Sequence, residues 1–288
     1  MKETIFVTGA TGNVGREVVK HLLQGGCKVI ASRLPHEKTE DSENLKYVIF
    51  DFTDPNTWDP CLEGVSKLFL MRPPHIAKIK RDMYPFLKYI KDKGINQVVF
   101  LSVQGVEKNK IVPHRKVEDF VRELEIPYTF VRPSFFMQNL TTTHLSEIRD
   151  ERMVFVPTGK GRTNFIDVRD IGEVMARMFF DKKHINQAYT ITGEISYSYK
   201  EVAEHLTKGL GRDILFINPN PISFVSHHLK KGRALAMTLV MLALYSVVKS
   251  GNGDISTSTS QEILGRKTRS LDEFIEDHKS LLTGQEEV

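Results

Sequence analysis

"TIFVTGATGNVGREVV", residues 4–19, contains three glycines between an apolar run and an amphipathic stretch. The apolar run predicts a strand, and the apolar residues from Val14 to Leu23 recur at helical spacing. Gly9, Gly12 and Gly15 therefore lie in a strand–turn–helix connection. A tight turn, a close approach of the backbone to a pyrophosphate and close packing of the helix each require that a side chain be absent.

Backbone N–H groups in this turn would point at the phosphates of a bound nucleotide, and the positive end of the helix dipole would assist them. An ordinary strand–helix turn is the alternative, but the full strand–turn–helix context favours nucleotide binding. The sequence thus predicts a dinucleotide-binding turn made of Gly9, Ala10, Thr11, Gly12, Asn13, Val14 and Gly15.

Short apolar runs continue to alternate with amphipathic stretches along the first half of the chain, at residues 28–31, 47–50, 67–71, 97–101 and 128–131. These runs are continuously apolar, which is typical of parallel strands covered on both faces. The order predicts an α/β fold, a Rossmann doubly wound parallel sheet over residues 1–150, with ligands at the carboxyl ends of its strands.

The second half, residues 151–288, changes character and predicts a smaller C-terminal substrate lobe, from which some strands and helices return to the Rossmann unit. Shorter strands are expected at 153–156 and 188–192. Capping boxes predict helix starts at Ser198 to Glu201, Thr259 to Glu262 and Ser270 to Glu273.

One run, "ALAMTLVMLALYSVV" at 234–248, is strongly apolar. Because it is shorter than the roughly 20 residues needed to span a bilayer, we expect a buried helix, or part of a lid over an apolar cavity, and no membrane partner.

The composition indicates which partners, compartment and metal sites to expect. The 288 residues carry a formal charge of +4 with no basic block, so nucleic acid is not an expected partner. Two cysteines are too few for a disulfide framework, and the N-terminus lacks a signal-peptide pattern, so a cytoplasmic protein is expected. His227 and His228 have no carboxylate at ligand spacing, so no metal site is expected.

The end of the second strand indicates the cofactor. NAD-dependent enzymes usually have an acidic residue there, which binds the ribose 2′-hydroxyl, but this chain has Ser32 and Arg33. A small residue followed by arginine leaves room for a 2′-phosphate and supplies a planar cation to bind it. NADP(H) is therefore preferred, NAD(H) remains possible, and Lys38 either assists or is a solvated loop residue.

Several stretches together resemble the NmrA-like branch of the atypical short-chain dehydrogenase/reductases over nearly the whole chain. They are "VTGATGNVG" (7–15), Arg33, "FDFTDP" (50–55), "LSVQGV" (101–106), "HRKVEDFVRELEIPYTFVRPSFFMQNL" (114–140) and "NFIDVRDIGEVMARMF" (164–179). The branch includes quinone reductases, azo- and triphenylmethane-dye reductases, and catalytically silent redox sensors.

The resemblance implies further cofactor contacts. Asp51 and Phe52 would flank the adenine, and Met71, Arg72 and Pro73 would line the middle of the cofactor. Ser102 and Val103 would approach the nicotinamide ribose, whose hydroxyls Lys116 would bind. Pro133, Ser134, Phe135 and Phe136 would surround the nicotinamide. Three of these residues also have a plain structural alternative, with Asp51 in a turn, Phe52 in the core and Lys116 in solvent.

One departure from the wider superfamily bears on the chemistry. Val112 stands four residues before Lys116, where a proton-donating tyrosine would be. Ketone reduction needs such a donor, and losing it costs on the order of 10² to 10⁴ in rate. Hydride addition to a quinone gives a stabilised anion that solvent, or a weak acid such as His114, can protonate later. The candidate catalytic residues are therefore Lys116 and His114.

Two functions remain open. The first is an NADPH-dependent reductase of quinones or related small aromatic acceptors by direct hydride transfer. The second is a catalytically silent NADP(H) sensor that regulates a protein partner. The missing tyrosine weakens a third, an epimerase or dehydratase acting on a nucleotide sugar. The chain is expected to be a monomer or a homodimer.

Overall fold

The computed structural model describes residues 3–285, which form two compact units. The first unit runs to Pro133 and also contains Val168–Ile191. The second contains Ser134–Asp167 and the chain from Thr192 onward. The boundary therefore lies at Pro133 and not at the expected residue 150, and the chain returns once to the first unit.

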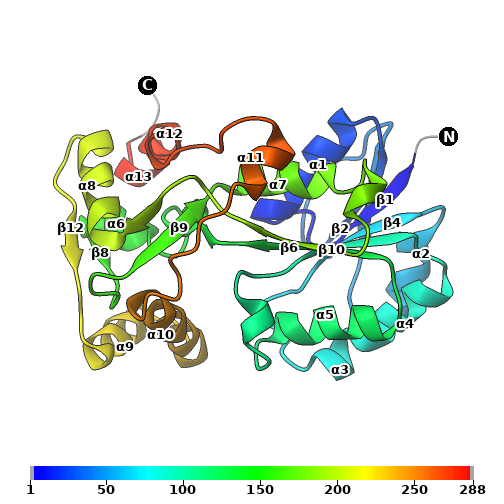
Figure 1. Cartoon of the computed structure of the whole chain (residues 1–288), viewed down its shortest axis with the longest axis horizontal. Helices are drawn as coiled ribbons and strands as arrows, with labels where there is room; N and C mark the ends of the chain where they lie inside the picture. Colours follow the sequence, from blue (N-terminus) through cyan, green and yellow to red (C-terminus); the bar gives the residue numbers. More distant parts are fainter. Residues whose placement is uncertain (1–2, 286–288) are drawn as a thin grey trace. The chain divides into compact units, whose positions relative to one another are not determined.

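The first unit contains a seven-stranded sheet in which every pair of neighbours is parallel, in the order β10-β6-β5-β4-β1-β2-β3 (Figure 1). All five residues of β5 are buried, which explains the continuous apolar run. The strands are β1 (Thr4–Val7), β2 (Lys28–Arg33), β3 (Leu45–Ile49), β4 (Lys67–Met71), β5 (Gln97–Leu101), β6 (Tyr128–Pro133) and β10 (Gln187–Ile191). The predicted doubly wound α/β fold is confirmed.

Helices cover both faces of this sheet (Figure 1). They are α1 (Asn13–Gln24), α2 (Trp58–Leu62), α3 (Ile79–Asp82), α4 (Tyr84–Asp92), α5 (Pro113–Glu123) and α7 (Val168–Arg177). Helices α2 to α5 pack on one face around an aromatic cluster that includes Phe50, Trp58 and Phe86. On the other face α7 packs so closely on α1 that a Cβ atom on Gly172 would lie 2.3 Å from Cβ of Glu17.

The expected strand at 188–192 belongs to this sheet and not to the second lobe. It forms β10, which pairs in parallel with β6 from Gln187 to Ile191. Local sequence does not reveal this pairing, because β10 comes more than fifty residues after β6 in the chain. It extends the sheet beyond the six strands of a basic dinucleotide-binding unit.

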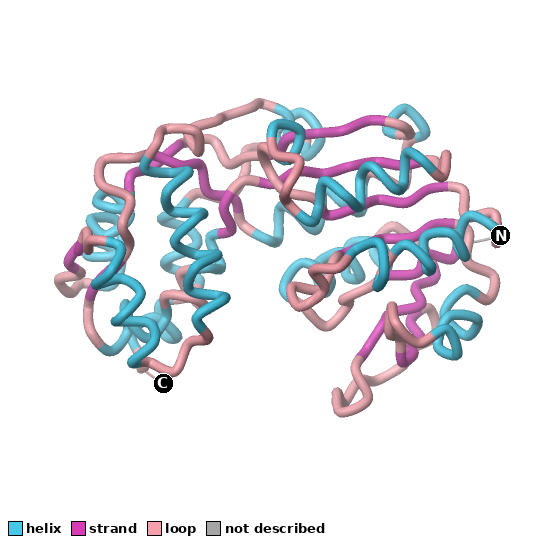
Figure 2. The backbone as a smooth tube through the Cα atoms, turned by 90° about the horizontal axis from the view of Figure 1, so that it is seen from below, coloured by secondary structure: helices cyan, strands magenta, loops and turns pink. Residues whose placement is uncertain are grey.

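The second unit is mostly helical, with short strands (Figure 2). Its strands are β7 (Phe135–Phe136), β8 (Met153–Phe155), β9 (Arg162–Ile166), β11 (Ser196–Ser198) and β12 (Leu215–Ile217). Its helices are α6 (Leu145–Asp150), α8 (Tyr199–Leu210), α9 (Pro221–Lys230), α10 (Leu235–Lys249), α11 (Thr259–Leu264), α12 (Leu271–Asp277) and α13 (Lys279–Thr283). The strands form two small sheets, β11-β9-β7 and β12-β8.

Two of the three predicted capping boxes are confirmed. Ser198 caps α8 with Glu201, and Ser270 caps α12 with Glu273. The box predicted at Thr259 is wrong, because the N-cap of α11 is Ser258. Ser258 has a helical backbone conformation, and its hydroxyl donates to the side chain of Glu262 instead.

The apolar run at 234–248 forms α10, but the expectation of a buried helix is wrong. Only one stripe is buried, made of Thr238, Met241, Tyr245 and Val248. Most of the other large apolar side chains of the helix are about half exposed, among them Leu239 (50%) and Val240 (55%). Within residues 3–285, no helix is both long and apolar enough to cross a membrane.

Candidate functional site

The glycine-rich turn joins β1 to α1 and leaves the start of α1 without a side-chain cap. Gly12 is the N-cap residue, its N–H donates to the carbonyl oxygen of Gly9 at 3.1 Å, and the first turn contains no acidic residue. Backbone N–H groups at an uncapped helix N-terminus bind anions. The turn can therefore hold phosphate groups through backbone atoms.

Two of the glycines are required by sterics. Gly9 has a left-handed backbone with φ of +62°, and a Cβ atom there would lie 2.2 Å from Cε of Met71. A Cβ atom on Gly15 would lie 2.0 Å from the carbonyl oxygen of Gly9. Gly15 thus allows α1 to pack directly on the turn. The side chains of Ala10 and Val14 are buried, so these residues can offer a ligand only backbone groups.

The end of β2 brings the two predicted cations together. Arg33 and Lys38 line the same hollow of about 510 Å³, with Glu37, Thr39, Asp41 and Tyr47. The guanidinium of Arg33 lies over its own loop and donates to the carbonyl oxygens of Leu34, Pro35 and Glu37 at 3.3–3.4 Å. Ser32 accepts a hydrogen bond from the N–H of Gly9 at 2.7 Å, which ties this loop to the glycine turn.

Glu37 is a residue of this hollow that sequence reasoning missed. Its carboxylate accepts hydrogen bonds from the hydroxyl of Thr11 at 2.7 Å and from the N–H of Leu34 at 2.6 Å. Burial raises the pKa of Glu37, but these hydrogen bonds and nearby cations bring it below its usual value. Glu37 lies in the loop four residues after Arg33. The rule that links residue type to cofactor covers only the end of the strand, so no sequence pattern indicated Glu37.

Asp51 and Phe52 follow β3 and have different surroundings. Asp51 is exposed and accepts hydrogen bonds from the N–H and hydroxyl of Thr53, both at 2.7 Å, so it forms a turn. Phe52 is buried against Phe50 and Phe86. The predicted adenine contact can therefore involve Asp51 and the backbone of Phe52, but not the Phe52 ring.

Met71, Arg72 and Pro73 lie at the end of β4, beside the turn after β1. The strand order reverses between β1 and β4, and such a switch point is where ligands bind in open parallel sheets. The N–H of Met71 donates to the hydroxyl of Thr8 at 2.8 Å. Arg72 donates to the carbonyl oxygens of Pro73 and Ile76, at 2.9 and 2.7 Å, and so fixes its own loop.

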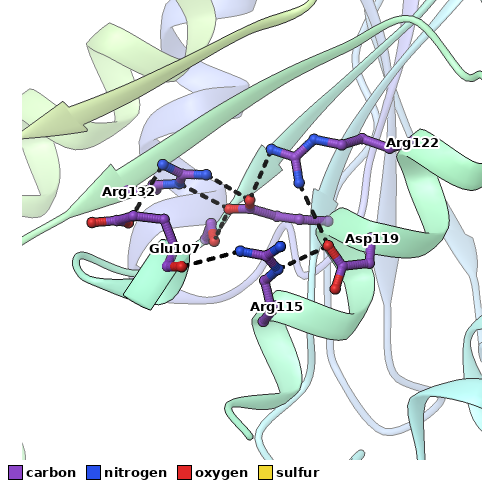
Figure 3. A network of polar contacts seen from close by, with 7 residues as sticks. Glu107, Arg115, Asp119, Arg122 and Arg132 are labelled. Carbon is purple, nitrogen blue, oxygen red and sulfur yellow. Dashed lines mark hydrogen bonds and ion pairs between the residues drawn. The ribbon is translucent and has the colours of Figure 1, made fainter. Parts of the chain in front are cut away.

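Ser102 follows directly after β5, and its hydroxyl already makes a hydrogen bond. It is buried and donates to the fully buried carboxylate of Glu118 at 2.7 Å. Glu118 also accepts two hydrogen bonds from Arg132, at 3.0 and 2.7 Å, and one from Arg122 at 3.3 Å, within the network of Figure 3. Only backbone atoms of Ser102, or the half-buried Val103, can approach a nicotinamide ribose.

Replacing Glu118 tests whether its buried carboxylate stabilises the end of β5. We expect Glu118→Gln to lower the free energy of unfolding by about 3 kcal/mol, because the nearly buried Arg132 then keeps only its longer ion pair, at 3.4 Å, with the more exposed Glu107. Asp119→Asn is the matched control, since Asp119 is half exposed in its ion pair with Arg115 and should cost under about 1 kcal/mol. Equal urea midpoints for the two variants would contradict this role of Glu118.

His114 and Lys116 lie in the first turns of α5, whose N-cap is Val112. Burial, helped by the charge of Arg72 and opposed by that of Glu118, lowers the pKa of His114 to about 4. His114 is therefore neutral at pH 7. Lys116 is exposed, and its side chain has no ion pair or hydrogen bond with the residues the structure describes, so its ribose contact stays a prediction.

The stretch predicted to surround the nicotinamide crosses the boundary between the units. Pro133 is the last residue of β6, and Ser134, Phe135 and Phe136 begin the second unit. Phe135 and Phe136 form β7, which pairs in parallel with β9. Both rings are half-buried, and their contact with a nicotinamide stays a prediction.

Comparison with known proteins adds independent information. The model of the NmrA-like family matches residues 1–275. The prestalk A differentiation protein A of Dictyostelium discoideum is 29% identical over 98% of this chain and 95% of its own length. The NAD(P)H azoreductase of Xenophilus azovorans is 26% identical over 95% of this chain and 97% of its own.

A solved structure shows the same fold. The NADPH-dependent quinone oxidoreductase of Escherichia coli in complex with NADPH superposes with a TM-score of 0.85, covering 95% of this chain and 99% of that one, at 18% identity.

Proposed function

The chain belongs to the NmrA-like family, and on that premise we propose that it is an NADPH-dependent reductase of quinones or related electron-poor aromatic acceptors. NADP(H) is the preferred cofactor, and NAD(H) is used less well. The named relatives support this class: one is an NAD(P)H azoreductase, and a structural neighbour is an NADPH-dependent quinone oxidoreductase. Quinones and azo dyes are both flat, electron-poor acceptors.

Residues of the first unit fit the cofactor part by part. The uncapped N-terminus of α1 provides N–H groups for the pyrophosphate, and it lies beside the switch point between β1 and β4. Arg33 and Lys38 line one hollow and provide two cations for a 2′-phosphate. Lys116 would bind the ribose hydroxyls, and its exposed ammonium has no competing partner among the described residues.

The observation that carries the reaction type is the start of α5. Val112 stands at its N-cap, and the nearby imidazole of His114 is neutral because its pKa is about 4. Neither group supplies a proton during reduction at neutral pH. This arrangement suits an acceptor that needs no proton donor in the transition state.

When bound, the nicotinamide would supply a hydride, which would carry two electrons and one proton to a carbonyl oxygen of the quinone. The protein contributes mainly positioning, since a correctly oriented pair of reactants removes much of the entropic cost. A quinone reduced in this way is a phenolate-type anion, which is stable enough to wait for a proton from solvent. One proton then completes the hydroquinone without a dedicated acid.

His114 provides a direct check on this account. We expect His114→Ala to change kcat for a quinone by less than about tenfold, because a neutral imidazole gives no proton. For the same reason, the pH profile of kcat between pH 6 and 8 should show no ionisation that the variant lacks. A loss beyond about a hundredfold would identify His114 as a real acid.

The proposal as a whole is tested by NADPH oxidation, followed at the nicotinamide absorbance, with a panel of benzoquinones, naphthoquinones and azo dyes. Saturable oxidation that depends on the protein is expected. Tight NADPH binding without turnover across the panel would favour the second function, an NADP(H) sensor that regulates a protein partner.

A further inference from the structure

A compact cluster of possible metal ligands lies in the second unit, where helices α6 and α9 meet. Glu147 comes from α6, and His227 and His228 come from α9. Oε1 of Glu147 lies 3.4 Å from Nε2 of His227 and 3.7 Å from Nδ1 of His228. One ligand atom from each residue lies within 4.8 Å of the other two.

These atoms are buried and lack hydrogen-bond partners. The side chains of Glu147 and His228 are 0% exposed, and that of His227 is 19% exposed. Within residues 3–285, Oε1 of Glu147, Nε2 of His227 and both ring nitrogens of His228 make no hydrogen bond. A buried polar atom left unpaired typically costs about 1–3 kcal/mol, so several that converge on one point indicate a missing partner.

Two imidazoles and a carboxylate whose ligand atoms converge on one point favour a cation as that partner, and the protonation states agree with this. Burial lowers the pKa of His228 to about 4, so its ring is neutral at pH 7. Burial raises the pKa of Glu147, but hydrogen bonds from its own N–H and the Ser146 hydroxyl, with the charge of Lys231, bring it to about 2. Neutral imidazole and ionised carboxylate are the forms that ligate metals.

We propose that Glu147, His227 and His228 bind one Zn²⁺ ion. Two imidazoles and a carboxylate are a ligand set that zinc takes, whereas Mg²⁺ and Ca²⁺ prefer oxygen ligands alone. Ligands at about 2.0–2.2 Å in a tetrahedron lie about 3.4 Å apart, close to the two separations found here. Three protein ligands leave the fourth position for water, and His227 is the exposed edge of the site.

Lys231 would compete with the ion, so replacing it provides a test in which the direction of the change in affinity is predicted. Its Nζ lies 3.3 Å from Oε1 of Glu147 and also pairs with Glu151. The ammonium therefore supplies part of the positive charge that zinc would bring. Lys231→Met removes this competitor, leaves all three ligands in place and should tighten Zn²⁺ binding.

No pattern in the sequence indicates this site. His227 and His228 have no carboxylate at ligand spacing, and the expectation of no metal site followed from that fact. Glu147 lies far away in the sequence, and only the packing of α6 against α9 brings it close. A bound ion would join these two helices and so stabilise the second unit.

The test uses the full-length protein, freed of metal with a chelator and titrated with Zn²⁺ in competition with a chromophoric chelator. Wild type should bind one equivalent tightly. His227→Ala and Glu147→Gln should each weaken that equivalent by more than the ~10- to 100-fold that loss of an outer-shell partner costs. His227 is partly exposed and Gln matches Glu in shape, so both variants should fold, which circular dichroism would check.

His205→Ala is the matched control, because His205 is partly exposed, lies 2.6 Å from Asp272 and belongs to no such cluster. It should keep the tight equivalent unchanged. A wild-type protein without a tight equivalent would overturn the site. So would a tight equivalent that survives both His227→Ala and Glu147→Gln, or one that is lost in His205→Ala.

Discussion

Gly15→Ala should weaken NADPH binding by a hundredfold or more. The new Cβ atom would lie 2.0 Å from the carbonyl oxygen of Gly9 and 2.8 Å from Cα of Ala10. Both contacts are with backbone, so the turn itself must move away from α1. A displacement of about 1 Å at a positioning element can cost on the order of a hundredfold in rate, and we expect a comparable loss in the affinity of a turn that holds the pyrophosphate. The measurement is the Kd of NADPH, from the change in nicotinamide fluorescence.

Gly172→Ala separates this effect from a general loss of packing. Its Cβ atom would lie 2.3 Å from Cβ of Glu17 and 2.9 Å from the backbone of that residue, between α7 and α1. We expect it to lower the melting temperature and leave the NADPH affinity of the folded protein within a factor of a few. Gly15→Ala protein that folds and binds NADPH as wild type does would refute the role of the turn.

Arg33→Asp should reverse the cofactor preference. The guanidinium of Arg33 lines the hollow after β2, and a carboxylate there would repel a 2′-phosphate and accept a hydrogen bond from a 2′-hydroxyl. Loss of a charge-assisted contact together with the new repulsion should weaken NADPH binding on the order of a hundredfold or more. NADH binding should change little or improve. The readout is the ratio of the two Kd values.

Lys88→Asp is the control for this charge change. Lys88 is an exposed residue of α4, so its substitution alters the net charge by the same amount without touching the hollow. The ratio of the two affinities should stay at its wild-type value. If Arg33→Asp weakens NADPH and NADH equally, Arg33 does not bind the 2′-phosphate.

The strands of the first unit were predictable because a parallel strand covered on both faces is apolar at every position. β4 and β5 coincide with the apolar runs at 67–71 and 97–101. The glycine spacing was equally informative, because Gly9 has a left-handed backbone that favours glycine and Gly15 lies too close to the backbone of the turn for a Cβ atom. The apolar runs and the glycine spacing each depend on residues that are close in the sequence, so both can be recognised without the structure.

The features that escaped prediction depend on packing between distant segments. The Ser102 hydroxyl is occupied by Glu118, which shares a buried network with Arg132 on a neighbouring element. The composition of α10 indicates burial, yet the helix contacts its surroundings along one stripe. Glu37 escaped because it lies in a loop, where no periodic pattern indicates what a side chain contacts.

We propose that hydride passes from NADPH to an aromatic acceptor on this protein. The decisive experiment mixes the protein with a naphthoquinone and NADPH deuterated at the transferred position, without oxygen. We expect one NADPH to be consumed for each hydroquinone formed, and deuterium to slow the reduction. NADPH that binds tightly and is not consumed, with every quinone tried, would contradict it.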